Sequence, residues 1–252
     1  MSSTLAWTAR RLPGADLLWQ ADRVIRKALV ILVGAALLSA CASTTTTGTS
    51  SNRTTSKVSV ASASPGTVSC TYVTASTPAK PVDPPNGSNV PATGKVAAVI
   101  QTNEGPITIT MDRSKTPCTI NSFLSLAEQK YFDATSCHRL VTSGLLLLQC
   151  GDPTGTGTGG PGYTFSDETY STDTFPAGTV AMANAGTNTN GSQFFLVYAD
   201  TGLPPKYTVF GHMDAAGIAI IAKIAADGQD GSNSAGGGKP KNPAKILSVT
   251  VG

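Results

Sequence analysis

The sequence predicts a mainly β fold, a closed eight-stranded antiparallel barrel capped by two α-helices, over residues 94–252. Two observations predict it: short apolar or alternating runs broken by turn residues, and two segments with helical periodicity. Closing the sheet on itself removes its vulnerable edges. An open sandwich is the alternative, and it explains the two helices less well.

The first elements are a hairpin and a helix. Residues 96–102 and 107–111 are apolar or alternating and flank an Asn-Glu-Gly-Pro turn, which is typical of a β-hairpin. Thr116 and Pro117 then form an N-cap and N1 pair. They open a predicted helix through residue 130, whose apolar residues recur on one face.

The remaining elements are six short strands and a second helix. The helix is expected over residues 215–226, where isoleucines recur with helical spacing and Gly228 follows as a stop signal. The strands are expected at residues 137–141, 145–150, 179–183, 193–197, 208–213 and 246–251.

Residues 1–40 have the features of a lipoprotein-type signal peptide. Basic residues precede an apolar run at 28–40, which is shorter than the roughly 20 residues needed to span a bilayer. Residues 38–41 (Leu-Ser-Ala-Cys) resemble a bacterial lipobox, so Cys41 would become an acylated N-terminus. The sequence therefore predicts an exported protein, anchored to the outer face of the cell membrane through lipid on Cys41.

Residues 41–93 are predicted to be a disordered tether. Ser, Thr, Pro and Gly dominate this segment, which has too few large apolar residues for a core. Cys70 and Tyr72 are the exceptions, and would fasten part of the tether to the domain. Removing residues 1–40 takes away five of the 18 basic and two of the 15 acidic residues, which leaves equal numbers of each. No nucleic-acid partner is therefore expected.

Four cysteines follow Cys41, and an even number in an oxidising compartment indicates two disulfides in one of three pairings. Zinc is the rival interpretation, but the sequence has no CxxC pair and its only histidines are isolated, so no metal site is expected. The four residues are Cys70, Cys118, Cys137 and Cys150.

We favour the pairs Cys118 with Cys137 and Cys70 with Cys150. Cys137 and Cys150 would lie on adjacent strands, but strand alternation puts them on opposite faces if Arg139 and Gln149 share one face.

Several familiar catalytic sites are excluded. The glycine-rich run at residues 155–162 lacks the Lys and Ser/Thr of a phosphate-binding loop, and no GxSxG motif occurs. A serine or cysteine hydrolase needs a histidine near its nucleophile, and only His138 and His212 are available.

Four sequence blocks resemble the cyclophilins, which are peptidyl-prolyl cis-trans isomerases. They are CHRL at 137–140, LQCGDPTGTGTGGPG at 148–162, FPAGTVAMANAGTNTNGSQFFLV at 175–197 and YTVFGHM at 207–213. Their order and spacing match over residues 97–252, and the cysteines resemble the exported actinobacterial branch. The resemblance implies the eight-stranded barrel with two helices, isomerase activity and no cofactor.

Arg139 matches the catalytic arginine of the family. Rotation about an X-Pro bond passes through a twisted state in which the prolyl nitrogen gains a lone pair. An arginine suits this state because it is always charged and offers several N–H donors in a rigid plane. By the same resemblance, Gln149 would lie beside it and hydrogen-bond the substrate backbone.

The resemblance also assigns the peptide-binding residues around the Asn/Gly/Thr/Gln run. Met182 and Phe195 would be apolar walls of a proline groove, the backbone groups of Ala183 and Asn184 would bind an extended peptide, and Gln193 would add a side-chain contact.

Three positions depart from the family pattern. Leu146 and Leu147 are the two candidates for the wall that many cyclophilins build from a Pro-Gly-Phe-Met segment. Leu203 stands where members that bind cyclosporin usually have tryptophan, and Tyr207 stands at a histidine position. We therefore expect isomerisation to survive and cyclosporin inhibition to be weak.

The resemblance implies that the protein isomerises X-Pro bonds in exported or cell-envelope proteins and so assists their folding. Its partners would be proline-containing segments of such proteins, and we expect a monomer. The alternative is a catalytically weak module that binds proline peptides at the cell surface, and a third possibility is a purely structural surface lipoprotein.

Overall fold

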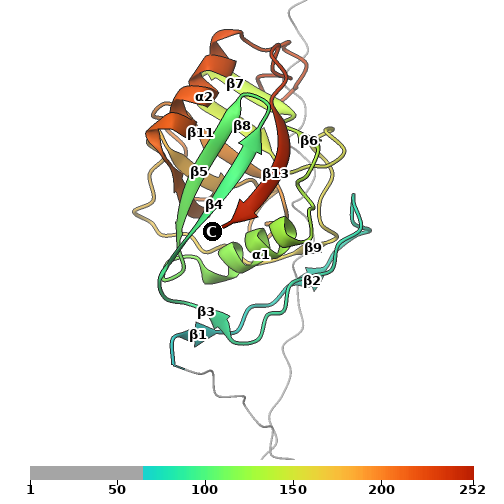
Figure 1. Ribbon diagram of the computed structural model, residues 1–252, viewed down its shortest axis with the longest axis vertical. Helices are drawn as coiled ribbons and strands as arrows, with labels where there is room; N and C mark the ends of the chain where they lie inside the picture. Colours follow the sequence, from blue (N-terminus) through green and yellow to red (C-terminus); the bar gives the residue numbers. More distant parts are fainter. Residues whose placement is uncertain (1–64) are drawn as a thin grey trace, which may run out of the picture. The chain divides into compact units, whose positions relative to one another are not determined.

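The computed structural model describes residues 65–252, and a nine-stranded antiparallel sheet forms its centre (Figure 1). The strands follow the order β6-β13-β4-β5-β12-β10-β11-β8-β7. Their bounds are β4 Lys95–Thr102, β5 Gly105–Asp112, β6 Thr135–Ser136, β7 Arg139–Ser143, β8 Leu145–Cys150, β10 Thr179–Met182, β11 Phe194–Val197, β12 Val209–Met213 and β13 Lys245–Val251.

The two edge strands, β6 and β7, are separated by only two residues along the chain. The sheet therefore curls, because its opposite edges must lie close together. The backbone N–H of Cys137, which lies between them, donates to the carbonyl of Ala244 just before β13 (2.8 Å). The mainly β fold with two helices is thus confirmed. The main sheet has nine strands where the sequence predicted eight, and no ladder joins β6 to β7 within residues 65–252. The short strand β6 was not predicted, because a two-residue strand is too short to show the alternation of apolar and polar residues.

The two helices have bounds close to those predicted. α1 is Pro117–Glu128 and packs on β13, while α2 is Ala215–Ala226 and packs on β5. Figure 1 shows them at opposite ends of the sheet. Asp214 caps α2, since its side chain accepts a hydrogen bond from the Gly217 N–H (2.7 Å).

The N-terminus of α1 is capped differently from the prediction. Thr116 occupies the N-cap position, but its side chain accepts no capping hydrogen bond. Instead, the carboxylate of Glu168 accepts from the backbone N–H groups of Cys118 (3.0 Å) and Thr119 (2.8 Å). A carboxylate at this position also complements the positive end of the helix dipole.

Residues 65–93, which the sequence assigned to the tether, pack on the domain. Their short strands are β1 Thr67–Val68, β2 Val73–Thr74 and β3 Val90–Pro91; β1 pairs with β3, and β2 pairs with β9 (Tyr163–Thr164). The Tyr72 hydroxyl donates to the Cys118 carbonyl (2.8 Å). Cys41, residues 1–40 and the tether up to residue 64 lie outside the described residues.

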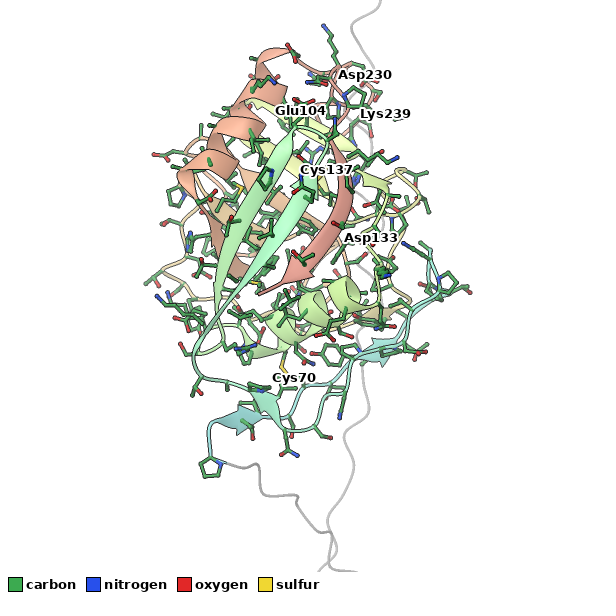
Figure 2. All side chains as sticks on the ribbon, in the orientation of Figure 1. Cys70, Glu104, Asp133, Cys137, Asp230 and Lys239 are labelled. Atoms are coloured by element: carbon green, nitrogen blue, oxygen red, sulfur yellow. A yellow bond between two sulfur atoms is a disulfide. The ribbon has the colours of Figure 1, made fainter. Side chains whose placement is uncertain are left out.

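The disulfides are Cys70–Cys118 and Cys137–Cys150, so the favoured pairing was wrong. Figure 2 shows the first of them beside α1, with Cys70 labelled. The alternation argument failed because β7 begins at Arg139, and Cys137 therefore lies outside the regular ladder. Freed from strand geometry, Cys137 turns into the core to meet Cys150, and both residues are buried.

The sheet separates two apolar clusters. The larger, the inner core, contains Phe123 of α1, Phe194 and Phe210 among many buried side chains. The smaller, which we call the outer cluster, consists of six buried residues: Val141, Leu147, Phe175, Ala181, Phe195 and Val197. Because side chains alternate along a strand, neighbours such as Phe194 and Phe195 serve different clusters.

Candidate functional site

Arg139, Gln149, Phe195 and Ala181 form one row across four neighbouring strands. Arg139 of β7 pairs with Gln149 of β8, Gln149 pairs with Phe195 of β11, and Phe195 pairs with Ala181 of β10. Residues directly opposite one another in antiparallel strands point to the same face of the sheet. The row therefore places the arginine on the face that carries the outer cluster.

The Arg139 guanidinium is held by three hydrogen bonds. Nε donates to the Gly236 carbonyl (2.8 Å), one terminal nitrogen donates to the Ala235 carbonyl (3.0 Å), and the other donates to Oε1 of Gln149 (3.2 Å). A guanidinium has five N–H donors. Two of them have no acceptor within residues 65–252, so the group is oriented and still has donors for a ligand.

A chain of amides extends from Arg139 across the sheet. Nε2 of Gln149 donates to Oε1 of Gln193 (2.9 Å), and Nε2 of Gln193 donates to the carbonyls of Gly157 and Gly159 (both 2.9 Å). Each amide in this chain has a defined orientation, because its oxygen accepts from one neighbour and its nitrogen donates to the next. The glycine-rich loop therefore supports the arginine through two glutamines.

The glycine-rich loop itself is organised by one buried carboxylate. Asp152 accepts hydrogen bonds from the backbone N–H groups of Thr154 (2.7 Å), Gly157 (2.7 Å) and Gly159 (3.1 Å). Burial by itself would raise the pKa of Asp152, but the hydrogen bonds from Thr154, Gly159 and Gly157 together outweigh it and hold this pKa below its ordinary value. The carboxylate of Asp152 therefore fixes the conformation of the glycine-rich loop, which accepts hydrogen bonds from Gln193.

Aromatic rings cover the centre of the outer cluster. The Phe195 and Tyr207 rings meet edge to face with centroids 5.6 Å apart, and Phe175 lies 6.2 Å from each of them. Leu203 and Ala183 pack at the margin and are half-buried. The margin thus reaches solvent, and the three rings, of which Phe175 and Phe195 are buried and Tyr207 is half-buried, form what we call the apolar floor.

Arg139 and Tyr207 are near enough to interact electrostatically. Partial burial lowers the pKa of the Arg139 guanidinium from its ordinary value, and the Tyr207 phenol partly opposes this shift. A guanidinium does not deprotonate in proteins at neutral pH, so the arginine remains charged.

The backbone beyond β10 has free hydrogen-bonding groups. The Ala183 N–H donates to the Gln193 carbonyl (2.9 Å), and Nδ2 of Asn184 donates to the Lys206 carbonyl (3.0 Å). The backbone N–H and C=O of Asn184 have no partner in the described part of the chain, and the residue is half-buried. They are available to an extended peptide.

Two of the expected groove residues lie elsewhere. Met182 is buried in the inner core. Its neighbour Ala181 faces the outer cluster, and Met182 points to the opposite face of the sheet, where it pairs with Phe194 rather than Phe195. Leu147 faces the outer cluster, and successive side chains along β8 point to opposite faces, so Leu146 points to the face of the sheet opposite the outer cluster.

The structure brings further residues to the outer cluster that the sequence reasoning missed. Leu145 packs against it from the start of β8, and Val209 does so from β12. Alternation counted back from Gln149 through Leu147 could have found Leu145. No sequence signal points to Ala235 and Gly236, because they act through backbone carbonyls far along the chain.

Metal clusters and membrane-spanning helices are both absent from residues 65–252. Among residues 65–252, no three or more His, Cys, Asp or Glu side chains gather as a metal site would require. Within the same residues, neither helix has the length and apolar character needed to cross a bilayer.

Comparison with known proteins gives consistent matches. The family model described as cyclophilin type peptidyl-prolyl cis-trans isomerase matches residues 97–251. The probable peptidyl-prolyl cis-trans isomerase B of Mycobacterium tuberculosis is 48% identical over 186 residues, which cover 68% of this chain and 58% of that protein. The Mycobacterium leprae protein of the same name is 48% identical over 198 residues, covering 72% and 65%. This chain therefore spans less than two thirds of the length of these relatives.

Solved structures agree. A cyclophilin type peptidyl-prolyl cis-trans isomerase of Cryptosporidium parvum superposes with a TM-score of 0.56 at 31% identity, over 63% of this chain and 98% of the other. The same protein, crystallised in the presence of the dipeptide Ala-Pro, superposes with a TM-score of 0.55 at 32% identity, over 62% and 98%.

Proposed function

Because this chain belongs to the cyclophilin-type peptidyl-prolyl cis-trans isomerase family, we propose that it accelerates isomerisation of X-Pro bonds in exported or cell-envelope proteins. One observation carries the proposal. The row formed by Arg139, Gln149 and Phe195 puts a fixed cation with spare donors on the same face as an apolar floor.

Isomerisation of an X-Pro bond requires few catalytic groups. Rotation about the X-Pro bond breaks amide resonance, with a barrier of about 18–20 kcal/mol for a peptide bond. No covalent bond has to form or break. Lowering the barrier by about 7 kcal/mol would speed the reaction roughly 10⁵-fold. A catalyst achieves this by stabilising the twisted state more than either planar isomer.

In the proposed mechanism, the proline ring of the substrate packs on the aromatic floor around Phe195. The free backbone groups of Asn184 hold the extended peptide, which fixes the residues on one side of the X-Pro bond that rotates. As the imide twists and its nitrogen becomes pyramidal, a spare N–H of Arg139 donates to the new lone pair. The hydrogen bond exists only in the twisted state, so it lowers the barrier rather than merely tightening binding.

The proposed partners are proline-containing segments of exported proteins, bound by a monomer. The Cryptosporidium parvum neighbour crystallised with Ala-Pro supports a proline-peptide ligand for a face of this kind. The apolar floor suits the proline ring of such a peptide, and the charged arginine beside it suits the polar X-Pro imide.

We further propose that the protein is exported and held at the outer face of the cell membrane by lipid on Cys41. The lipobox-like residues 38–41 support this. The two disulfides support it independently, because disulfides persist in oxidising compartments. Mass spectrometry of the mature N-terminus tests it: an acylated Cys41 is expected, and an unmodified N-terminus upstream of it would contradict the proposal.

A protease-coupled isomerisation assay on a proline peptide tests the enzymatic function, with Arg139→Ala measured beside the parent. We expect an active parent and a variant slower by at least about 100-fold, since a hydrogen bond from a charged group contributes about 1.5–3 kcal/mol and orientation adds to it. Two equally slow proteins that still bind the peptide would instead support the alternative, a binding module.

A further inference from the structure

The loop between α2 and β13 holds the Arg139 guanidinium through two backbone carbonyls. Its residues 230–239, which we call the arginine loop, include the Ala235 and Gly236 carbonyls that accept from the Arg139 guanidinium. Asn233 shapes the tip, where its Oδ1 accepts from the Ala235 N–H (2.9 Å) and its carbonyl accepts from the Gly236 N–H (2.9 Å).

The carboxylate of Asp230, together with one backbone hydrogen bond, closes the neck of the arginine loop. Oδ1 of Asp230 accepts from the backbone N–H groups of Ser232 (3.0 Å) and Lys239 (2.8 Å), and the Asp230 N–H donates to the Lys239 carbonyl (3.1 Å). Figure 2 labels Asp230 and Lys239 close together at one end of the molecule. The two ends of the loop are thus joined by the Asp230 side chain and by one backbone hydrogen bond.

The loop is also docked on the residue next to Arg139. Leu140 of β7 exchanges backbone hydrogen bonds with Gly238 (2.7 and 3.0 Å). Gly237 approaches so closely that a Cβ on it would lie 2.2 Å from the Leu140 carbonyl oxygen, where no side chain fits. The loop that carries the two orienting carbonyls is therefore fixed to β7 directly beside Arg139.

We propose that Asp230 is a positioning residue for the isomerase: by closing the neck of the arginine loop, it keeps the Ala235 and Gly236 carbonyls where they aim Arg139. The inference rests on the proposed function. Asp230 touches neither substrate nor reacting atoms, and acts through the loop. Hydrogen bonds from Ser232 lower the pKa of Asp230, so its carboxylate stays an acceptor at neutral pH.

The chain offers a matched control at Asp112. Its Oδ1 accepts from the N–H (3.0 Å) and the hydroxyl (2.7 Å) of Ser114 two residues later, as Asp230 accepts from Ser232. Asp112 closes a turn after β5, and none of the residues that hold Arg139 is among its hydrogen-bond partners. A merely structural role would make the two aspartates equivalent.

The first test measures kcat and KM separately, together with the melting temperature, for Asp230→Ala, Asp230→Asn and Asp112→Ala in the full chain. We expect Asp230→Ala to lose about tenfold in kcat with little change in KM, because misplacing a catalytic group costs rate more than ground-state binding. Asp230→Asn, which keeps an acceptor oxygen, should recover most of the rate. Asp112→Ala should keep the parent kcat, and a kcat for Asp230→Ala equal to that of Asp112→Ala would overturn the proposal.

The second test reads the arginine directly by NMR, as the hydrogen-exchange protection of the Arg139 Nε–H, which donates to Gly236. Protection should fall in Asp230→Ala and persist in Asp112→Ala; equal protection in both would refute the positioning role. This reading decides the inference even if the parent shows no isomerase activity, in which case the proposed function fails separately.

A glycine pair gives the same comparison without changing charge. Gly237 and Gly231 both have positive φ (78° and 70°), but a Cβ on Gly231 would meet nothing within 4 Å. Both alanine substitutions carry the backbone strain, and only Gly237→Ala also pushes the loop off Leu140. We expect a larger loss of kcat for Gly237→Ala, and equal losses would count against the loop's role.

Discussion

Replacing Cys70 and Cys118 together by alanine should destabilise the protein substantially. The disulfide links residues 48 positions apart. Opening a loop of this length restores enough chain entropy to the unfolded state to cost about 4 kcal/mol of unfolding free energy. For a folded unit of this size, about 2–4 °C of melting temperature accompanies each kcal/mol, so the melting temperature should fall by roughly 8–16 °C.

Calorimetry of the parent and the double variant measures this change, and thiol titration under denaturing conditions tests the pairing. Because the two removed cysteines are partners, the number of free thiols should not change. An increase of two free thiols would show that Cys70 and Cys118 pair with other cysteines. An unchanged melting temperature would show that residues 65–93 contribute little to folding.

Three further predictions concern the site and its surroundings. Gln149→Leu should lower kcat/KM about tenfold in the coupled assay, since it removes a hydrogen bond to a charged group worth about 1.5–3 kcal/mol; parental activity would contradict this. Burial lowers the pKa of His138, against an opposing effect of Asp152, so the unfolded chain takes up the proton first as pH falls below about 6.5. Stability in urea should therefore decline from pH 7.5 to pH 5, less so in His138→Gln, and an identical decline in that variant would refute the argument. Cyclosporin should inhibit weakly and Leu203→Trp should strengthen inhibition; submicromolar inhibition of the parent would show that Leu203 is not the deciding residue.

The sequence predicted regular elements well because their signals are local. The hairpin β4–β5 was placed by alternation around a turn, and α2 by the spacing of its isoleucines. Both bounds agree with the structure to within two residues. These patterns depend only on side-chain period and local turn chemistry, which a single sequence contains.

The errors arose where distant residues decide the outcome. Glu168 caps α1 from 49 or 50 positions away, so the N-cap Thr116 looked sufficient in the sequence. Cys137 leaves the ladder before β7, which local alternation could not show. Residues 65–93 looked disordered by composition, yet the Cys70–Cys118 disulfide holds them on α1.

The candidate site was predictable only in part for the same reason. Motif blocks identified Arg139, Gln149 and Phe195, which the register brings into one row. Met182 was misplaced because a motif names a residue without saying which face of the strand it occupies. The carbonyls that aim the arginine belong to residues whose identity carries no chemical signal.

The most direct test of the account compares the parent with Arg139→Lys by NMR exchange spectroscopy on a short proline peptide. Lysine keeps the charge but lacks the planar fork that reaches Gln149 and both loop carbonyls. We predict that both proteins bind the peptide and that only the parent accelerates cis-trans exchange, by at least about 100-fold over the variant. Equal exchange rates in the two proteins would contradict the claim that an oriented guanidinium stabilises the twisted imide.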